Sequence, residues 1–204
     1  ATVVPSAQQI IASQNQPACL KDASAGLVDC GNWGVSGEFN TTGMTSGVFI
    51  ARPRRTDTGG ASHIVFIVRD DARKAEVLFQ TSDTTWQAYN QYPGLADGGS
   101  SLYCNGPLDN SAGDYSCATR SAKVSYNRPF DTRDHDKNSW LFNGEYPMLR
   151  WLEANGYDTK YWAGVDTDRL GASAAIGLTS PAGPKAFLSV GHDEYWSGQQ
   201  RANV

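Results

Sequence analysis

Long apolar runs and an excess of basic residues are both missing from this 204-residue sequence. No stretch approaches the roughly 18 consecutive apolar residues that a membrane-spanning helix needs. The formal net charge is −4, and no basic segment is present that could neutralise a phosphate backbone. We therefore expect neither a membrane nor a nucleic acid as a partner.

The sequence also lacks the short motifs of several common enzyme classes. It contains no G-x-S-x-G, and no cysteine stands beside a histidine at a strand-to-helix turn, so serine and thiol nucleophiles of those kinds have no candidate. Neither G-x-x-x-x-G-K nor G-x-G-x-x-G occurs, which leaves a phosphate-binding loop unsupported. Its three histidines are too few and too scattered for H-E-x-x-H or the clustered ligands of common zinc sites.

Four cysteines are present, and they lie in two pairs that are each close in sequence: Cys19 with Cys30, and Cys104 with Cys117. Four cysteines allow three pairings, but two short loops are the easiest to close. We therefore predict disulfides 19–30 and 104–117 and a secreted, extracellular protein, because disulfides persist in oxidising compartments. The alternative is four free thiols in a cytosolic protein, which the polar surroundings of these cysteines disfavour.

The first part of the chain, residues 1–72, has the pattern of β structure. Two apolar stretches, 48–51 and 64–68, are joined by a Gly-rich polar segment of hairpin type. This pattern predicts the last strands of a small β-sandwich domain.

The remainder, residues 73–204, alternates strand and helix patterns. Strand-like runs at 77–79, 157–164 and 185–190 are separated by helical periodicity in "GEYPMLRWLEANG", which ends at the left-handed stop Asn155-Gly156. Short connections of this kind predict an α/β domain with a parallel sheet covered on both faces. An S-x-x-Q capping box at Ser197 opens a last helix, and the sequence stops four residues later, so we expect this domain to be incomplete.

The strand-to-helix stretch "GHDE", residues 191–194, is the first candidate site. Ligands of open α/β sheets gather at the carboxyl ends of the strands. Side chains alternate along extended backbone, so His192 and Glu194 are expected on one side and Asp193 on the other. The competing interpretation is a strand end with solvated charges.

Two further segments place polar and aromatic residues after short apolar runs, "QTSDTTWQAYN" and "KVSYNRPF". They add the site candidates Asp83, Trp86, Tyr89, Asn90, Tyr126 and Asn127. Taken one at a time, each tyrosine is better explained as a half-buried structural residue with its hydroxyl satisfied.

These segments, together with "EYPMLRWLEANGYDTKYWAGVDTD" and "FLSVGHDEYWSGQQRANV", resemble in order and spacing the catalytic domain of the N,N-dimethylformamidase large (beta) subunit family. The resemblance covers about residues 77 to 204. It implies a class I glutamine amidotransferase-like (flavodoxin-like) fold. It also implies a mononuclear iron, Fe³⁺, with Tyr89, Tyr126 and Glu194 as ligands and His192 as a catalytic residue, and a small amide as substrate.

The implied chemistry is consistent with the residue types. Two tyrosinates and a carboxylate form a hard oxygen set that suits ferric iron, and a histidine beside the metal could move protons. Members of the family contribute further active-site residues beyond the point where this sequence stops, so we expect the remainder of the polypeptide or another subunit as a partner. The alternatives are a secreted glycan- or cell-wall-binding module, suggested by the Trp and Tyr content, and a catalytically inactive fragment of a larger enzyme.

Overall fold

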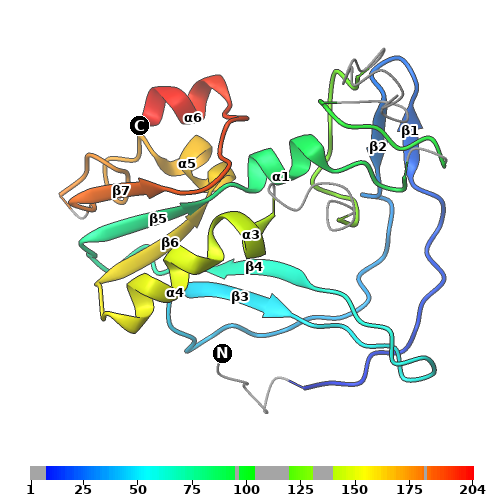
Figure 1. Cartoon of the computed structure of the whole chain (residues 1–204), viewed down its shortest axis with the longest axis horizontal. Coiled ribbons are helices and arrows are strands. Elements are labelled where there is room, and N and C mark those ends of the chain that lie inside the picture. Colours follow the sequence, from blue (N-terminus) through cyan, green and yellow to red (C-terminus); the bar gives the residue numbers. More distant parts are fainter. Residues whose placement is uncertain (1–7, 95–96, 104–119, 131–139, 182) are drawn as a thin grey trace. The chain divides into compact units, whose positions relative to one another are not determined.

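A computed structural model describes residues 8–94, 97–103, 120–130, 140–181 and 183–204 of the chain. The chain divides into two compact units, each drawn from two stretches of sequence (Figure 1). The first unit comprises residues 1–43 and 91–131, and the second comprises residues 44–90 and 132–204. The segment 44–72, which the sequence pattern grouped with the first β-rich region, belongs to the second unit. The predicted domain boundary after residue 72 stays a prediction.

A three-stranded parallel sheet forms the centre of the second unit. Its strands are β5 (Val77–Thr81), β6 (Thr159–Ala163) and β7 (Ala186–Ser189), in the order β6-β5-β7. Four of the five residues of β5 are buried, as expected of a central strand covered on both faces. The predicted mixed α/β structure with a parallel sheet is therefore confirmed.

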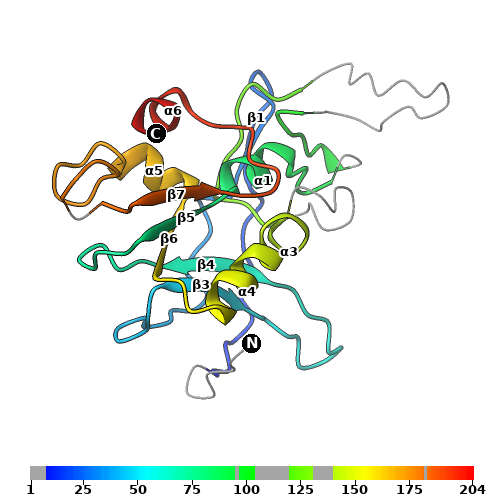
Figure 2. The ribbon, with the colours of Figure 1, turned by 60° about the vertical axis from the view of Figure 1, so that its left-hand side comes forward.

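The two connections between the strands of this sheet cross it in opposite directions. Chain order leads from β5 to β6 on one side, and then from β6 across to β7 on the other side. Crossovers between parallel strands are right-handed in nearly all proteins, so helices in these two connections cover opposite faces. Figure 2 shows α4 (Tyr146–Ala154) on one side of the sheet and α5 (Gly164–Leu170) on the other.

Short helices complete the second unit. Helix α1 (Asp83–Tyr89) follows β5, α3 (Leu141–Gly144) precedes α4, and α6 (Gly198–Asn203) follows β7. The predicted end of α4 is confirmed: the helix stops at Asn155, and Gly156 takes the left-handed conformation with φ of 69°. At the start of α6, the Ser197 hydroxyl accepts a hydrogen bond from the Gln200 amide at 2.8 Å. The side chain of Gln200 has no hydrogen-bond partner among the described residues, so only the serine half of the predicted capping box forms.

The core of the second unit is aromatic. Phe79 and Trp162 are fully buried, and the Phe79 ring packs against Tyr161 at 6.0 Å between centroids. The Tyr161 hydroxyl donates to Glu153 of α4. The antiparallel hairpin β3 (Gly47–Ala51) and β4 (Ile64–Val68), which the sequence predicted, also contacts β6.

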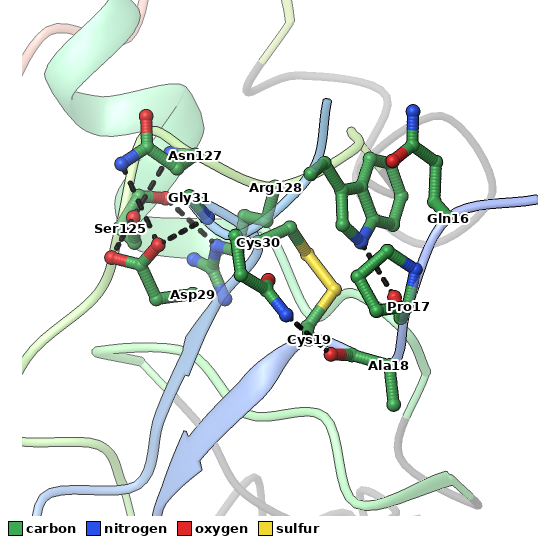
Figure 3. Close-up of a disulfide and its surroundings, with 12 residues drawn as sticks. Gln16, Pro17, Ala18, Cys19, Asp29, Cys30, Gly31, Ser125, Asn127 and Arg128 are labelled. Carbon is green, nitrogen blue, oxygen red and sulfur yellow. Dashed lines mark hydrogen bonds between the residues drawn. A yellow bond between two sulfur atoms is a disulfide. The ribbon is translucent and has the colours of Figure 1, made fainter. Parts of the chain in front are cut away.

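The first unit has little regular structure within its described residues. Strands β1 (Leu20–Asp22) and β2 (Leu27–Asp29) form an antiparallel pair closed by the predicted disulfide between Cys19 and Cys30 (Figure 3). That part of the disulfide prediction is confirmed. The other predicted pair, Cys104 and Cys117, lies outside the described residues.

Across the described ranges, each helix is too short or too polar to cross a bilayer.

Candidate active site

The candidate site lies at the carboxyl edge of the parallel sheet, where β5 and β7 end side by side. Helix α1 begins directly after β5, and the turn of residues 190–197 follows β7. Because parallel strands point the same way, both loops emerge at one edge. The sequence placed its candidates at this edge, and the structure brings several of them together there.

Tyr89, His192 and Glu194 converge on one carboxylate oxygen. The Tyr89 hydroxyl donates to Glu194 Oε1 at 2.5 Å, and His192 Nε2 lies 3.0 Å from the same oxygen. The Tyr89 and His192 rings are 5.2 Å apart, and Tyr195 packs edge-on against Tyr89. Side-chain exposures of 33% for His192 and 47% for Glu194 leave this cluster open to solvent.

Asp193 turns away from this cluster, as the alternation along extended backbone predicted. Its Oδ2 accepts hydrogen bonds from Gln80 Nε2 at 2.8 Å and from Ser189 Oγ at 2.6 Å. Both donors belong to the sheet, so Asp193 anchors the turn to the strands that carry it. The direct contacts of Asp193 are therefore structural.

Helix α1 holds the backbone of the same turn. The Thr85 hydroxyl accepts hydrogen bonds from the amides of Glu194 and Tyr195 at 3.0 and 3.1 Å. Thr85 and Tyr89 are four residues apart, so they lie on the same face of the helix. That face therefore fixes both the backbone and the carboxylate of Glu194.

Three other predicted residues from the segment around α1 occupy buried positions. The Asp83 carboxylate accepts from the Thr81 hydroxyl at 2.9 Å and from the Gly164 amide at 2.5 Å, which ties the start of α1 to the start of α5. Trp86 packs against Trp140 at 5.4 Å between ring centroids. Asn90 is fully buried and caps the end of α1. Their described contacts support the scaffold beneath the site.

Tyr126 and Asn127 belong to the first unit, whereas Tyr89, His192 and Glu194 belong to the second. The Tyr126 side chain is 47% exposed. Its neighbours are held by Asp29, which accepts from Ser125 Oγ at 3.0 Å and from Asn127 Nδ2 at 3.5 Å (Figure 3). The Cys30 amide donates to the Asn127 carbonyl at 2.5 Å, so this segment is fixed next to the disulfide.

Arg128 completes this arrangement. It is buried, and it donates to the backbone carbonyls of Ser125 and Ser100 at 3.1 Å each. Burial lowers the pKa of the Arg128 guanidinium to about 10, because desolvation penalises its charged form. Arg128 therefore ties the backbone at Ser125, next to Tyr126, to the backbone at Ser100.

A buried acid, Glu145, lies at the same edge of the sheet. It was not predicted from the sequence. It is 1% exposed, and its Oε1 accepts a hydrogen bond from the Ser82 amide at 2.5 Å. Burial, with Asp83 and Asp193 nearby, raises the pKa of Glu145 to about 8. Its position before Pro147 at the start of a helix was the one available signal, and that signal indicates a helix start rather than a site.

Throughout the residues that the structure describes, no three His, Cys, Asp or Glu side chains form a group that could hold a metal ion. The expected ligand set differs from such groups, because two of its three members are tyrosines. The phenol oxygen of Tyr89 and the carboxylate of Glu194 lie within hydrogen-bond distance of each other. Two such oxygen donors suit a hard metal ion.

The sequence model of the family described as "N,N-dimethylformamidase beta subunit-like, C-terminal" matches residues 1–204. The chain belongs to this family. The match includes the 76 residues that precede the segments on which the resemblance rested. Comparison with curated protein sequences gave no match.

Proposed function

We propose that this chain is part of a hydrolase that cleaves the C–N bond of a small linear amide, with iron as cofactor. Membership of the N,N-dimethylformamidase beta subunit-like family supports the reaction class. The observation that carries the proposal within this chain is the convergence of Tyr89 and His192 on Glu194 Oε1. A phenol, an imidazole and a carboxylate at an exposed sheet edge can bind a hard metal ion and move protons beside it.

The residues that would hold the iron are Tyr89, Tyr126 and Glu194. Tyrosine is a poor ligand while its phenol keeps the proton, which has an ordinary pKa near 10. Because Tyr89 donates its proton towards a carboxylate, that proton already has an acceptor within hydrogen-bond distance. Bound ferric iron would polarise an amide carbonyl and lower the pKa of a water beside it.

We assign proton transfer to His192. Imidazole can both accept and return a proton near neutral pH, and the Nε2 atom of His192 lies 3.0 Å from Glu194 Oε1. That contact orients the ring towards the carboxylate. His192 would take a proton from water and return one to the leaving amine, which balances the hydrolysis to acid and amine.

Three further proposals accompany this function. The family description names a beta subunit and a C-terminal region, and we infer that other parts of the polypeptide or another subunit complete the active site. The strand order β6-β5-β7 with helices on both faces is compatible with the class I glutamine amidotransferase-like (flavodoxin-like) fold that we propose. The Cys19–Cys30 disulfide supports our proposal of a secreted protein.

The test is metal analysis with a visible spectrum of the protein purified with iron. We expect about one iron per chain and a tyrosinate-to-iron charge-transfer band, because ferric iron displaces the phenol proton. Tyr89→Phe and Tyr126→Phe should each weaken or abolish that band. Tyr157→Phe is the matched control, because Tyr157 is as exposed as Tyr126 (47% each) and lies outside the predicted ligand set.

The spectrum separates the possible outcomes. A protein that stays colourless and metal-free after iron is offered overturns the proposal. Loss of the band in the Tyr157 variant would assign the colour to nonspecific iron binding. If the band depends on Tyr89 and Tyr126, hydrolysis of small amides is the next measurement, with His192→Asn expected to keep iron and lose turnover.

A further inference from the structure

Glu145 occupies the point where helices α3 and α4 meet the first of the two loops that carry the site. It is the residue between these helices, and its side chain is almost fully buried. Its Oε1 accepts from the amide of Ser82, the residue that precedes α1. Glu145 therefore fixes the turn from β5 into the helix that carries Thr85 and Tyr89.

The same junction also meets the second loop. The backbone of Gly144 packs so closely on Gly191 that a Cβ at Gly191 would come within 2.9 Å of it. Gly191 has a φ of 80°, which favours glycine on its own account. Ser82 Oγ lies 3.3 Å from the carbonyl oxygen of Val190, to which it donates. The junction of α3 and α4 thus touches both loops on which His192 and Glu194 depend.

The surroundings of Glu145 favour its uncharged form. Asp83 of α1 and Asp193 of the turn after β7 are the carboxylates that face it. The titratable His63 packs against Phe142 of α3, one turn away. Among the described residues, no lysine or arginine forms an ion pair with Glu145, and its buried Oε2 has no hydrogen-bond partner there. A buried carboxyl without a cation keeps its proton.

We propose that Glu145 is a positioning residue of the site, whose protonated carboxyl holds the β5–α1 turn against the turn that follows β7. Its ionisation would add a third carboxylate charge beside Asp83 and Asp193, and the two loops would then separate. Any effect of Glu145 on catalysis rests on the function proposed above. The contacts themselves exist without iron or substrate, so they can be tested in metal-free protein.

The experiment is hydrogen exchange of metal-free protein between pH 6.5 and pH 9.5, with rates corrected for the intrinsic effect of pH. The reporters are the amides of Glu194 and Tyr195, which donate to Thr85 Oγ1, and the Ser82 amide. We expect corrected exchange at these amides to rise at least about tenfold in the wild type as Glu145 ionises. The raised pKa, about 8, places the midpoint within this range.

Glu145→Gln is the informative variant, because the amide keeps a neutral acceptor of the same shape and cannot ionise. It should hold the low exchange rates of the wild type at pH 6.5 throughout the whole range. Glu153→Gln is the matched control: Glu153 lies on α4, the helix that Glu145 precedes, and its carboxylate also accepts a hydrogen bond, from Tyr161. That variant should keep the pH response of the wild type.

Two results would overturn the proposal. One is a wild-type exchange profile at these amides that does not change with pH, and this measurement stands even if the Gln variant fails to fold. The other is a Glu145→Gln profile that follows the wild type, which would leave Glu145 an ordinary packing residue. An absence of iron or of amidase activity would overturn the proposed function, but it would leave the hydrogen-exchange result unaffected.

Discussion

The two compact units achieve order by different means. The second unit is built around a parallel sheet with fully buried aromatic residues such as Phe79 and Trp162. The first unit has one pair of three-residue strands among its described residues, and it relies on a disulfide and on the hydrogen bonds of Asp29 and Arg128. Apolar burial stabilises the residues around Tyr89, and covalent and polar contacts stabilise those around Tyr126.

The acids of the two units also differ in the direction of their pKa shifts. Burial raises the pKa of Glu145 in the second unit. The Gly31 amide, followed by the Ser125 hydroxyl, lowers the pKa of Asp29 in the first unit. A raised acid pKa costs stability as pH rises, and a lowered one costs stability as pH falls. The units should therefore respond oppositely to pH.

Phe79→Ala should have the largest effect, because it empties the middle of the central strand. A buried Phe truncated to Ala costs about 3–5 kcal/mol of unfolding free energy, and Phe79 is fully buried. Ile64→Ala is the control in the same unit: Ile64 is 58% exposed, and exposed substitutions usually change stability by less than about 0.5 kcal/mol. Urea denaturation followed by tryptophan fluorescence measures both. Equal losses would contradict a core centred on β5.

Removing the disulfide should have the next largest effect, and it should be confined to the first unit. Cys19 and Cys30 are 11 residues apart, and closing a loop of that size contributes about 3 kcal/mol in the chain-entropy model. Replacing both cysteines with serine should therefore raise hydrogen exchange in β1, β2 and residues 125–128. Exchange in β5 and β6 serves as the internal reference, and an equal rise there would show that the units unfold together.

Asp29→Asn should have the smallest effect at neutral pH and a clear effect on pH dependence. The folded pKa of Asp29 lies below its ordinary value of 3.8, so its contribution is present above that value and is lost as pH falls through the folded pKa. Wild-type exchange at residues 125–127 should increase in acid. The variant should lack this change and lose about 1 kcal/mol at pH 7.

Asp22→Asn is the matched control for Asp29. The Asp22 carboxylate also accepts several hydrogen bonds, but they come from Ser24 and Ala25 within the same turn. Its replacement should leave exchange at residues 125–127 unchanged. A response there equal to that of the Asp29 variant would show that general charge, rather than the hydrogen bonds of Asp29, orders the segment.

Features set by neighbouring residues could be predicted from the sequence. The end of α4 at Asn155-Gly156, the Ser197 cap and the opposite directions of Glu194 and Asp193 all depend on residues within a few positions. The parallel sheet followed from the alternation of strand and helix patterns. The Cys19–Cys30 pair followed from its short loop.

Features set by distant partners could not be predicted in the same way. Asp83 was a site candidate, yet its carboxylate accepts from Gly164, 81 residues along the chain. Asn127 is held by Asp29 over a separation of 98 residues. Glu145 was missed because its partner, Ser82, is 63 residues away. Burial of a polar side chain is decided by such pairings, which no local pattern records.

Helix α1 carries a constraint on its length. Thr85 Oγ1 holds the backbone at Glu194, and Tyr89 contacts the carboxylate of the same residue one helical turn later. A substitution that the helix accommodates leaves this spacing intact. Inserting or deleting one residue between Thr85 and Tyr89 would rotate them by about 100° relative to each other and shift them by about 1.5 Å. The number of residues between Thr85 and Tyr89 is therefore constrained in addition to the identities of the buried side chains of α1.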